Sequence, residues 1–343
     1  MSTTDDRVSD PATSPRAATT ARPRRRLAAV ARGLAVLTLT VLGAGLVGAT
    51  TESVLSRGDD ERYPAPGTLV ATDHGSLHVH CTGTGSPTVL LEAGLGEPGM
   101  TWVDIQRDLA RSLTVCSYDR SGYGWSPPAD GDWDARVAAT QAVQALHAAG
   151  HDGPYVVVAH SVGALVAREL RRTDPDAVAG MVLLDPTNEV TLARVGTPAA
   201  AIAERTAMGM LARTGVVRLL GDRLIPALVG SQPPRDLLDR APAAYHPGAV
   251  AASLRELRGA PGAATHLLAN EDADWAELPL AVVSAATTSQ QDRGHHRDLA
   301  SRSAAGRHLT ADVGGHYIHY DDRDLVITAI CGVVAATAGS RGC

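Results

Sequence analysis

Ser161 stands at the point where an apolar run meets a helical pattern, in the stretch Ala159-His160-Ser161-Val162-Gly163. Serine is a favoured residue at the start of a helix, so Ser161 could be an ordinary N-cap. It could also be a nucleophile on a strained strand-to-helix turn, which requires small neighbours such as Ala159 and Gly163. The pentapeptide alone fits both interpretations, so other residues must decide between them.

A serine nucleophile needs a base within hydrogen-bond reach and an acid that orients the base. His316 follows two glycines in the stretch GGHYIHYDD, after the last apolar run. We predict His316 as the base, with His319 as the alternative. Asp185 ends the strand that follows the Ser161 helix, and Asp292 is the first acid after the next strand. We favour Asp185 as the orienting acid and keep Asp292 as the alternative.

The stretch LEAGLGEPGMTW, residues 91–102, follows the third apolar strand pattern. An oxyanion hole in such a protein takes one backbone N–H from this loop and one from the residue after the nucleophile. Those donors would be Leu95 and Val162. The loop also contains G-x-G-x-x-G, with Asp119 about 20 residues further on, which is the pattern of a dinucleotide site. Against that alternative, two strands precede the loop and Glu97 would lie beside the pyrophosphate.

Short apolar runs alternate with helical patterns from about residue 65 onwards. Strands are expected at residues 68–73, 76–82, 88–93, 113–119, 155–160, 180–185, 278–285 and 307–313. Helices are expected at residues 103–112, 135–150, after Ser161 and at 322–337. This alternation predicts an α/β fold with a mostly parallel eight-stranded sheet and helices on both faces. The continuous apolar character of the strands agrees with a buried parallel sheet.

Residues 187–275 interrupt the alternation with a helical pattern after the sixth strand. Prolines are expected to break this segment into short pieces, at Pro198, Pro226, Pro233, Pro234 and Pro242. An insertion at the carboxyl edge of a parallel sheet would cover the ligand crevice. We interpret the segment as a lid. Its content of Ala, Leu, Val and Met indicates a small-molecule substrate with an apolar acyl or alcohol group.

The composition allows a large core and argues against one class of partner. The chain has 343 residues, of which 44% are hydrophobic, and a formal net charge of -6. That charge is unlike the basic balance of a nucleic-acid-binding domain, so we expect no nucleic-acid partner. Nothing in the composition indicates an oligomeric state.

The N-terminal segment differs from the rest of the chain. Residues 1–26 are polar, end in an arginine cluster and predict a disordered cytoplasmic tail. No residue from Gly33 to Thr51 is charged, so residues 27–51 are predicted to be a transmembrane signal-anchor, with a cleaved signal peptide as the alternative. In either case the remainder is exported: a linker at 52–65, a main domain at 66–338 and a tail at 339–343. The protein would lie in the cell membrane with its main domain outside the cytoplasm, or be secreted.

No group of residues has the spacing of a metal site. The cysteines form no CxxC motif, and they are Cys81, Cys116, Cys331 and Cys343. Export permits disulfides between them. A group of histidines has no acid or cysteine nearby and is expected to lie on a solvated hairpin: His74, His78 and His80. The adjacent His295 and His296 are likewise expected in a polar loop.

Four motifs in sequential order, AGLG, YDRSGYGWSP, AHSVG and GHYIHYD, resemble the α/β-hydrolase fold superfamily. The resemblance covers roughly residues 66–338. It implies the chain order serine, acid, histidine, which Ser161, Asp185 and His316 satisfy, with the acid placed after the sixth strand as in a minority of members. Ala159 replaces the usual first glycine of the serine motif, a departure that the family tolerates. A serine nucleophile implies hydrolysis of an ester, amide or thioester through an acyl-enzyme, without a cofactor.

The resemblance also implies roles for residues outside the predicted triad. Asp119 and Arg120 are expected to tie down the loop DRSGYGWS, which is mainly structural in the family. The family's strand order places the second and fourth strands side by side, so a Cys81–Cys116 disulfide is plausible if the register allows, with two buried thiols as the alternative. Cys331 and Cys343 could join the C-terminal tail to its helix.

The sequence therefore predicts a serine hydrolase in which Leu95 and Val162 stabilise the oxyanion. Two other functions stay open at this point. One is a non-catalytic binding protein that keeps the same fold, and the other is a dinucleotide-binding protein that uses the loop at Gly94.

Overall fold

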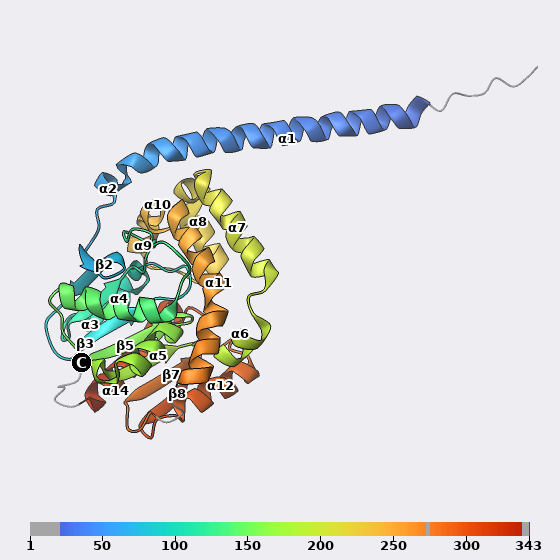
Figure 1. Ribbon diagram of the computed structural model, residues 1–343. Coiled ribbons are helices and arrows are strands. Elements are labelled where there is room, and N and C mark those ends of the chain that lie inside the picture. The colour runs from blue at the N-terminus through green and yellow to red at the C-terminus, as the bar shows by residue number, and fades with distance from the viewer. Residues whose placement is uncertain (1–20, 272–274, 338–342) are drawn as a thin grey trace, which may run out of the picture. The chain divides into compact units, whose positions relative to one another are not determined.

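The structure is a computed structural model that describes residues 21–271, 275–337 and 343 (Figure 1). The chain divides into two compact units, Met1–Val47 and Gly48–Cys343. The larger unit contains each strand that the structure describes and all of the residues that the sequence singles out for chemistry.

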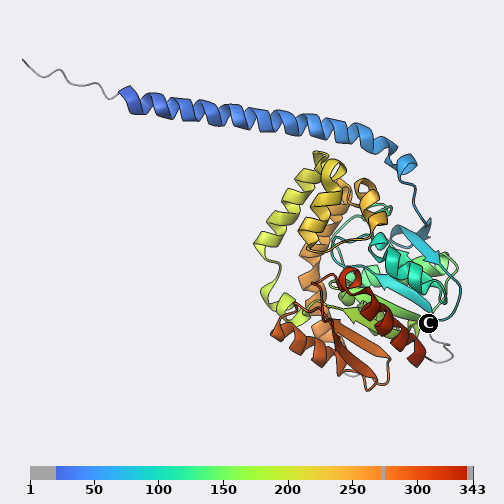
Figure 2. The ribbon, with the colours of Figure 1, turned by 180° about the vertical axis from the view of Figure 1, so that it is seen from behind.

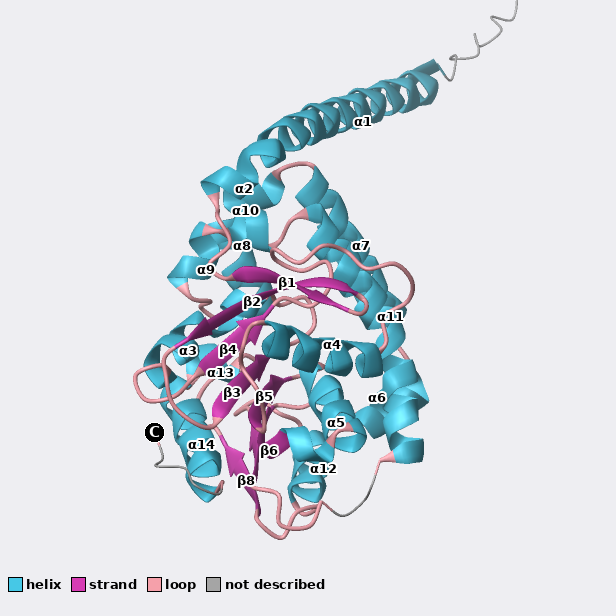
Figure 3. Cartoon of the chain, turned by 60° about the vertical axis from the view of Figure 1, so that its left-hand side comes forward, coloured by secondary structure: helices cyan, strands magenta, loops and turns pink. Residues whose placement is uncertain are grey.

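The larger unit is built on one eight-stranded sheet with the order β1-β2-β4-β3-β5-β6-β7-β8 (Figure 3). β2 is antiparallel to both of its neighbours, and all other neighbouring strands are parallel. The strands are β1 Thr68–Thr72, β2 Gly75–Thr82, β3 Thr88–Glu92, β4 Val115–Tyr118, β5 Tyr155–His160, β6 Val178–Leu184, β7 Leu280–Ser284 and β8 Gly306–Thr310. The predicted fold class and strand number are confirmed.

Helices cover both faces of the sheet. Because side chains alternate along a strand, Val157 and Ala159 of β5 belong to one hydrophobic cluster, while Val156 and Val158 belong to another. The first cluster includes residues of α4 (Ala135–Ala148), α5 (Gly163–Thr173) and α12 (Gln290–Ala300). The second includes residues of α3 (Val103–Leu109) and α14 (Arg323–Ala336), the red helix in Figure 2. Short helices complete the fold: η2 Gly99–Trp102, η3 Pro175–Ala177 and α13 Ile318–Asp321.

A helical insertion follows β6, as predicted. It consists of α6 Glu189–Val195, α7 Ala199–Arg213, α8 Val216–Val229, α9 Arg235–Asp239, α10 Ala241–Ala244 and α11 Pro247–Asn270. Pro198 and Pro234 stand directly before α7 and α9. Pro226, however, lies inside α8, so the expectation that it breaks the helix is wrong. A proline removes its own N–H donor and its ring crowds the carbonyl one turn earlier, yet α8 continues past Pro226 to Val229. It ends at Gly230, whose N–H donates to the Pro226 carbonyl.

The N-terminal apolar segment forms the long helix α1, Ala21–Leu55, which extends beyond the predicted 27–51 at both ends. Side chains from residue 27 to residue 44 are exposed. Within the described residues, one candidate span is long and apolar enough to cross a membrane by length and composition, and this span starts at Leu27 within α1. Residues 1–20 of the predicted disordered tail lie outside the described part of the chain, whereas the backbone of residues 21–26 is helical.

The segment expected as a linker, residues 52–65, packs against the insertion. It contains the end of α1, the turn η1 (Ser56–Gly58) and the short helix α2 (Asp59–Arg62). Glu52 and Asp59 are buried, and each accepts two hydrogen bonds from the guanidinium of Arg218 on α8, at 2.6–2.9 Å. Three charged groups that share hydrogen bonds in this way hold the segment against α8.

Both suspected disulfides are present. Cys81 of β2 lies directly opposite Cys116 of β4 in the antiparallel register, and the two are joined. Cys331 of α14 is joined to Cys343. The register of β2 and β4 therefore allows the Cys81–Cys116 disulfide, as the prediction required.

Candidate active site

Ser161 forms a sharp turn between β5 and α5. Its φ angle is +53°, a conformation that a residue with a side chain seldom adopts and that concentrates at functional sites. Its N–H donates to the Leu184 carbonyl at 3.0 Å. A Cβ added at Gly163 would lie 2.5 Å from the Ala93 carbonyl oxygen, so the strand and helix approach too closely for a side chain there. The helix N-cap is Val162, so Ser161 is not an ordinary capping serine.

The side chains of Ser161, His316 and Asp185 form one chain of hydrogen bonds. Ser161 Oγ lies 2.8 Å from His316 Nε2, and His316 Nδ1 lies 2.6 Å from Asp185 Oδ2. Ser161 follows β5, Asp185 follows β6, and His316 lies in the loop after β8. Because β5, β6 and β8 run parallel, their carboxyl ends bring these residues to the same edge of the sheet.

The environment of Asp185 keeps it ionised. Burial alone would raise the pKa of its carboxyl, but hydrogen bonds from His316 and Thr288 outweigh burial and lower the pKa to about 2. The second oxygen accepts hydrogen bonds from the Thr288 hydroxyl at 2.5 Å and the Ala285 N–H at 3.2 Å. An ionised, fixed carboxylate can hold an imidazole in one tautomer and stabilise its protonated form.

The alternative acid and base lie outside this chain of hydrogen bonds. Asp292, in the first turn of α12, accepts hydrogen bonds from Ser289 at 2.7 Å and Asn188 at 3.0 Å. His319 is 2% exposed and lies 3.1 Å from the Thr101 hydroxyl. Burial, together with the charge of His160, holds the pKa of His319 well below its usual range. Among the described residues, neither Asp292 nor His319 forms a hydrogen bond with His316 or Ser161.

The two expected oxyanion donors have no competing acceptor. In the described part of the chain, neither the Leu95 N–H nor the Val162 N–H donates a hydrogen bond. The loop that carries Leu95 is fixed by Arg120, which donates to the carbonyls of Ala93 at 2.6 Å and Gly94 at 2.7 Å. These N–H groups are therefore free to donate to a substrate oxygen.

Arg120 does more than the sequence indicated. It was expected to tie down its own loop, but its buried guanidinium also contacts Glu92 at 2.5 Å and Glu256 of α11 at 2.9 Å. Burial raises the pKa of Glu92 to about 7, against the effect of the Arg120 charge. One arginine thus connects β3, the Leu95 loop and the helical insertion. In the sequence, the position of Arg120 directly after the expected strand at 113–119 was the feature that could have indicated these buried contacts.

A second buried group, which was not predicted from the sequence, adjoins Ser161. His160 Nδ1 lies 2.8 Å from Glu97 Oε1, and His160 Nε2 lies 2.9 Å from the His316 carbonyl oxygen. Both ring nitrogens face acceptors, so the ring carries both protons. Burial would lower the pKa of His160, but the Glu97 carboxylate raises it. The His160 charge in turn lowers the pKa of Glu97 to about 2, although burial would raise it.

Glu97, His160 and His319 could in principle bring one ligand atom each to a metal ion, because these atoms lie within 4.8 Å of one another. The hydrogen bond between Glu97 and His160 accounts for the arrangement without an ion. Glu97 also accepts from the Gly94 N–H at 3.2 Å.

The glycine loop is closed to a pyrophosphate. The Gly94 N–H is bound by Glu97, and the Gly99 N–H donates to Asp119 at 2.6 Å. Asp119 is 1% exposed and also accepts a hydrogen bond from His78 at 2.8 Å. The backbone donors and the acid that a dinucleotide would need are therefore occupied, and the dinucleotide hypothesis has no support.

Three histidines lie in environments that differ from those predicted from the sequence. His78 was expected to be solvated but is buried against Asp119. His295 and His296 were expected in a polar loop but lie in α12, where they contact Glu189 and the Pro186 carbonyl. In each case an acceptor distant in sequence determines the environment.

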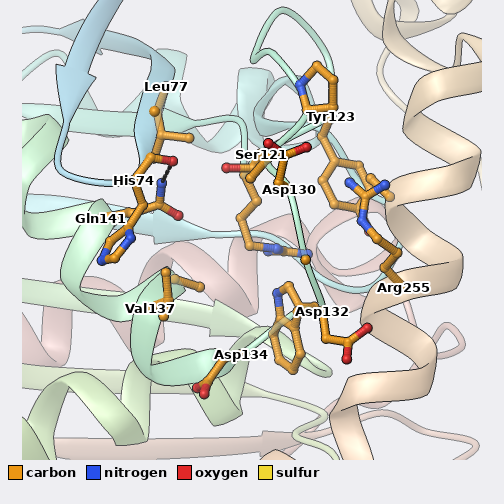
Figure 4. Close-up of a pocket in the computed structure, with 18 of the residues that line it drawn as sticks. His74, Leu77, Ser121, Tyr123, Asp130, Asp132, Asp134, Val137, Gln141 and Arg255 are labelled. Atoms are coloured by element: carbon orange, nitrogen blue, oxygen red, sulfur yellow. Dashed lines mark hydrogen bonds between the residues drawn. The ribbon is translucent and has the colours of Figure 1, made fainter.

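Three cavities in the described part of the chain lie near the loops discussed above. The one in Figure 4 is lined by the segment between β4 and α4, including Asp130 and Asp132, together with Arg255 of α11, and it contains no member of the hydrogen-bonded triad. A second lies between the Leu95 loop and the insertion, and its wall includes Tyr245 and Tyr317. The second cavity borders one expected oxyanion donor, Leu95, and it also contains no member of the triad. A third, more open cavity is lined by two triad residues, Asp185 and His316, together with Thr288 and Asp292.

Comparisons with known proteins agree with this fold. A family model described as "Alpha/beta hydrolase family" matches residues 77–329. Lipase LipV of Mycobacterium tuberculosis is 40% identical over 122 residues, 35% of this chain and 45% of that protein. The uncharacterized protein YqjL of Bacillus subtilis is 34% identical over 111 residues, 31% of this chain and 42% of that protein. The chain thus spans less than half the length of these relatives. A thermophilic esterase from Thermogutta terrifontis has a similar fold, with a TM-score of 0.57, 19% identity and coverage of 77% of this chain and 96% of that one.

Proposed function

The chain belongs to the alpha/beta hydrolase family, and on that premise we propose that it is a serine hydrolase which cleaves a carboxylic ester, or a related amide or thioester. The observation that carries the proposal is the chain of hydrogen bonds from Ser161 through His316 to Asp185. The positive φ of Ser161 supports it, because a strained turn presents the hydroxyl at the edge of the sheet.

The geometry supports a two-step reaction. Ser161 Oγ forms a bond to the substrate carbonyl carbon while its proton passes to His316 Nε2, and Asp185 stabilises the resulting imidazolium. The Leu95 and Val162 N–H groups donate to the oxyanion. His316 then returns the proton to the leaving alcohol, amine or thiol as its bond to carbon breaks. In the second step a water molecule gives a proton to His316, attacks the acyl carbon and releases the acid, and the proton returns to Ser161.

The cavity beside the Leu95 loop is our proposed substrate site. Its wall on the insertion includes Met208, Val217 and Ile225, which favours a substrate with an apolar acyl or alcohol group. The name of the relative LipV fits cleavage of an ester. The insertion would act as a lid over this cavity.

We also propose that α1 anchors the protein in the cell membrane with the hydrolase domain outside the cytoplasm. The exposed apolar run and the arginines that precede it in the sequence support this orientation. The two disulfides fit an oxidising compartment. Alkaline extraction of membranes tests the anchor, and the N-terminal sequence of the mature protein distinguishes it from a cleaved signal peptide. Recovery of the whole protein in the cytoplasmic fraction would contradict export.

A chain-length series of p-nitrophenyl esters tests the activity. We expect turnover by the full chain, and a loss of at least about 10³-fold in kcat for Ser161→Ala. Ser301→Ala, at the exposed C-terminal end of α12, is the matched control and should leave turnover unchanged. Absence of turnover with every ester, amide and thioester tested would favour a binding protein of the same fold.

A further inference from the structure

One arginine of the insertion lies beside the loop that carries the expected oxyanion donor. Arg205 of α7 lines the same cavity as Leu95 and Gly96. A Cβ added at Gly96 would lie 2.7 Å from Arg205 Nη1, so the guanidinium rests directly against this residue. Gly96 has a φ of +78° and no side chain, which leaves room for the guanidinium next to Leu95.

Arg205 has no hydrogen-bond acceptor among the described residues, although its charge partly offsets the rise that burial causes in the pKa of Glu256. Among the described residues its partly buried side chain forms no hydrogen bond, ion pair or cation–π contact. The buried acids nearby are committed elsewhere: Glu97 binds His160, and Glu256 binds Arg120 and Tyr123. Glu204 also lines the cavity, but it is exposed and forms no ion pair with Arg205.

An unpaired guanidinium in this position favours an anionic ligand. The cavity wall is otherwise mostly apolar and aromatic, and a cation partly removed from water without an acceptor costs free energy. A carboxylate would remove that cost, because its two oxygens match the planar fork of a guanidinium. The apolar wall would meanwhile contact the hydrocarbon that separates the carboxylate from the ester.

We propose that Arg205 determines substrate specificity by binding a carboxylate on the acyl part of the substrate. The substrate class is then an ester of a dicarboxylic acid, with one carboxyl group esterified, a short hydrocarbon spacer and one free carboxylate. This inference rests on the proposed hydrolase function and narrows it.

The test compares two esters of similar size. Mono-p-nitrophenyl glutarate carries a free carboxylate, and p-nitrophenyl pentanoate is its neutral counterpart. We expect the full chain to show a higher kcat/KM for the glutarate ester. Arg205→Met should lower the glutarate-to-pentanoate ratio of kcat/KM by about 10- to 100-fold, and Arg205→Lys should lower it less. Arg213→Met, at the exposed end of the same helix, should leave the ratio unchanged.

A ratio that Arg205→Met does not change, or a preference of the full chain for the pentanoate ester, would overturn the inference. Labelling of Ser161 by a neutral fluorophosphonate is measured alongside. A labelled protein without carboxylate preference contradicts only the role of Arg205. A protein that is neither labelled nor active on either ester contradicts the hydrolase proposal and the inference with it.

Discussion

Glu97 and His160 form a buried ion pair directly beside the proposed nucleophile, with 2.8 Å between Oε1 and Nδ1. The His160 ring also lies 4.6 Å from the His316 ring and donates to the His316 carbonyl. The residue before Ser161 therefore connects the Leu95 loop, through Glu97, to the loop of the proposed base. Both loops must hold their positions for the proposed reaction, so this pair is a positioning element.

Glu97→Gln tests whether Glu97 positions the loops of the proposed active site, because loss of positioning should lower kcat more than it changes KM. The amide keeps the shape but removes the charge that keeps His160 protonated, so His316 and the Leu95 loop lose part of their common support. We expect kcat for a neutral ester to fall by about 10- to 100-fold, with a smaller change in KM. The exposed Glu61→Gln serves as a control. A variant with normal kcat and a normal pH profile would show that the pair has only a structural role.

Two carboxylates of the proposed active site, Glu97 and Asp185, should make the protein sensitive to acid. The pKa values of Glu97 and Asp185 are lowered to about 2 in the folded protein, from ordinary values of 4.5 and 3.8. The unfolded chain therefore binds more protons between about pH 4.5 and pH 2, so the free energy of unfolding decreases as the pH falls through that window. The loss should be on the order of 2 kcal/mol for each group. Urea unfolding at pH 6 and pH 3 measures this decrease in the free energy of unfolding. The decrease should be smaller for Glu97→Gln than for the natural chain, and equal decreases would show that Glu97 does not contribute to it.

Gly163 should tolerate no side chain. An added Cβ would lie 2.5 Å from a main-chain carbonyl oxygen, so the nucleophile turn would have to shift. We expect Gly163→Ala to destabilise the protein by about 1–3 kcal/mol and to reduce kcat. Gly262→Ala is the control, because this glycine lies in α11 with nothing within 4 Å of an added Cβ. That change should be neutral or stabilising by up to about 1 kcal/mol. Equal effects at the two positions would show that the turn is not tight.

The triad candidates were predictable because each follows a strand. Ser161 and Asp185 directly follow parallel strands, and His316 lies in the loop after the last strand, so strand order alone places them at one edge. The eight strands were predictable for a related reason, since buried parallel strands are continuous apolar runs. Residue types and spacing along the chain carry this information.

Contacts between distant polar residues were not predictable in the same way. Glu97 and His160 are 63 residues apart, and nothing in either local sequence indicates their hydrogen bond. Glu52 likewise belonged to an apparent linker, although it binds Arg218 on α8, 166 residues away. Such pairs depend on tertiary packing rather than on local pattern, and so does the burial of His78.

The orienting acid can be identified by two matched substitutions. Asp185→Asn removes the charge that contacts His316, and kcat should fall by about 10²- to 10⁴-fold. Asp292→Asn changes an acid that binds Ser289 and Asn188 instead, and its kcat should stay within about threefold of the natural chain. Ester turnover measures both. A larger loss for Asp292→Asn than for Asp185→Asn would reverse the assignment.

Covalent labelling shows directly whether Ser161 is the nucleophile. The full chain is treated with a fluorophosphonate, digested, and its peptides are analysed by mass spectrometry. A serine whose proton His316 accepts displaces fluoride and keeps the phosphonyl group. We expect a single adduct on Ser161, its loss in Ser161→Ala and slower formation in His316→Ala. An adduct on another serine, or continued labelling of Ser161→Ala, would show that Ser161 is not the nucleophile.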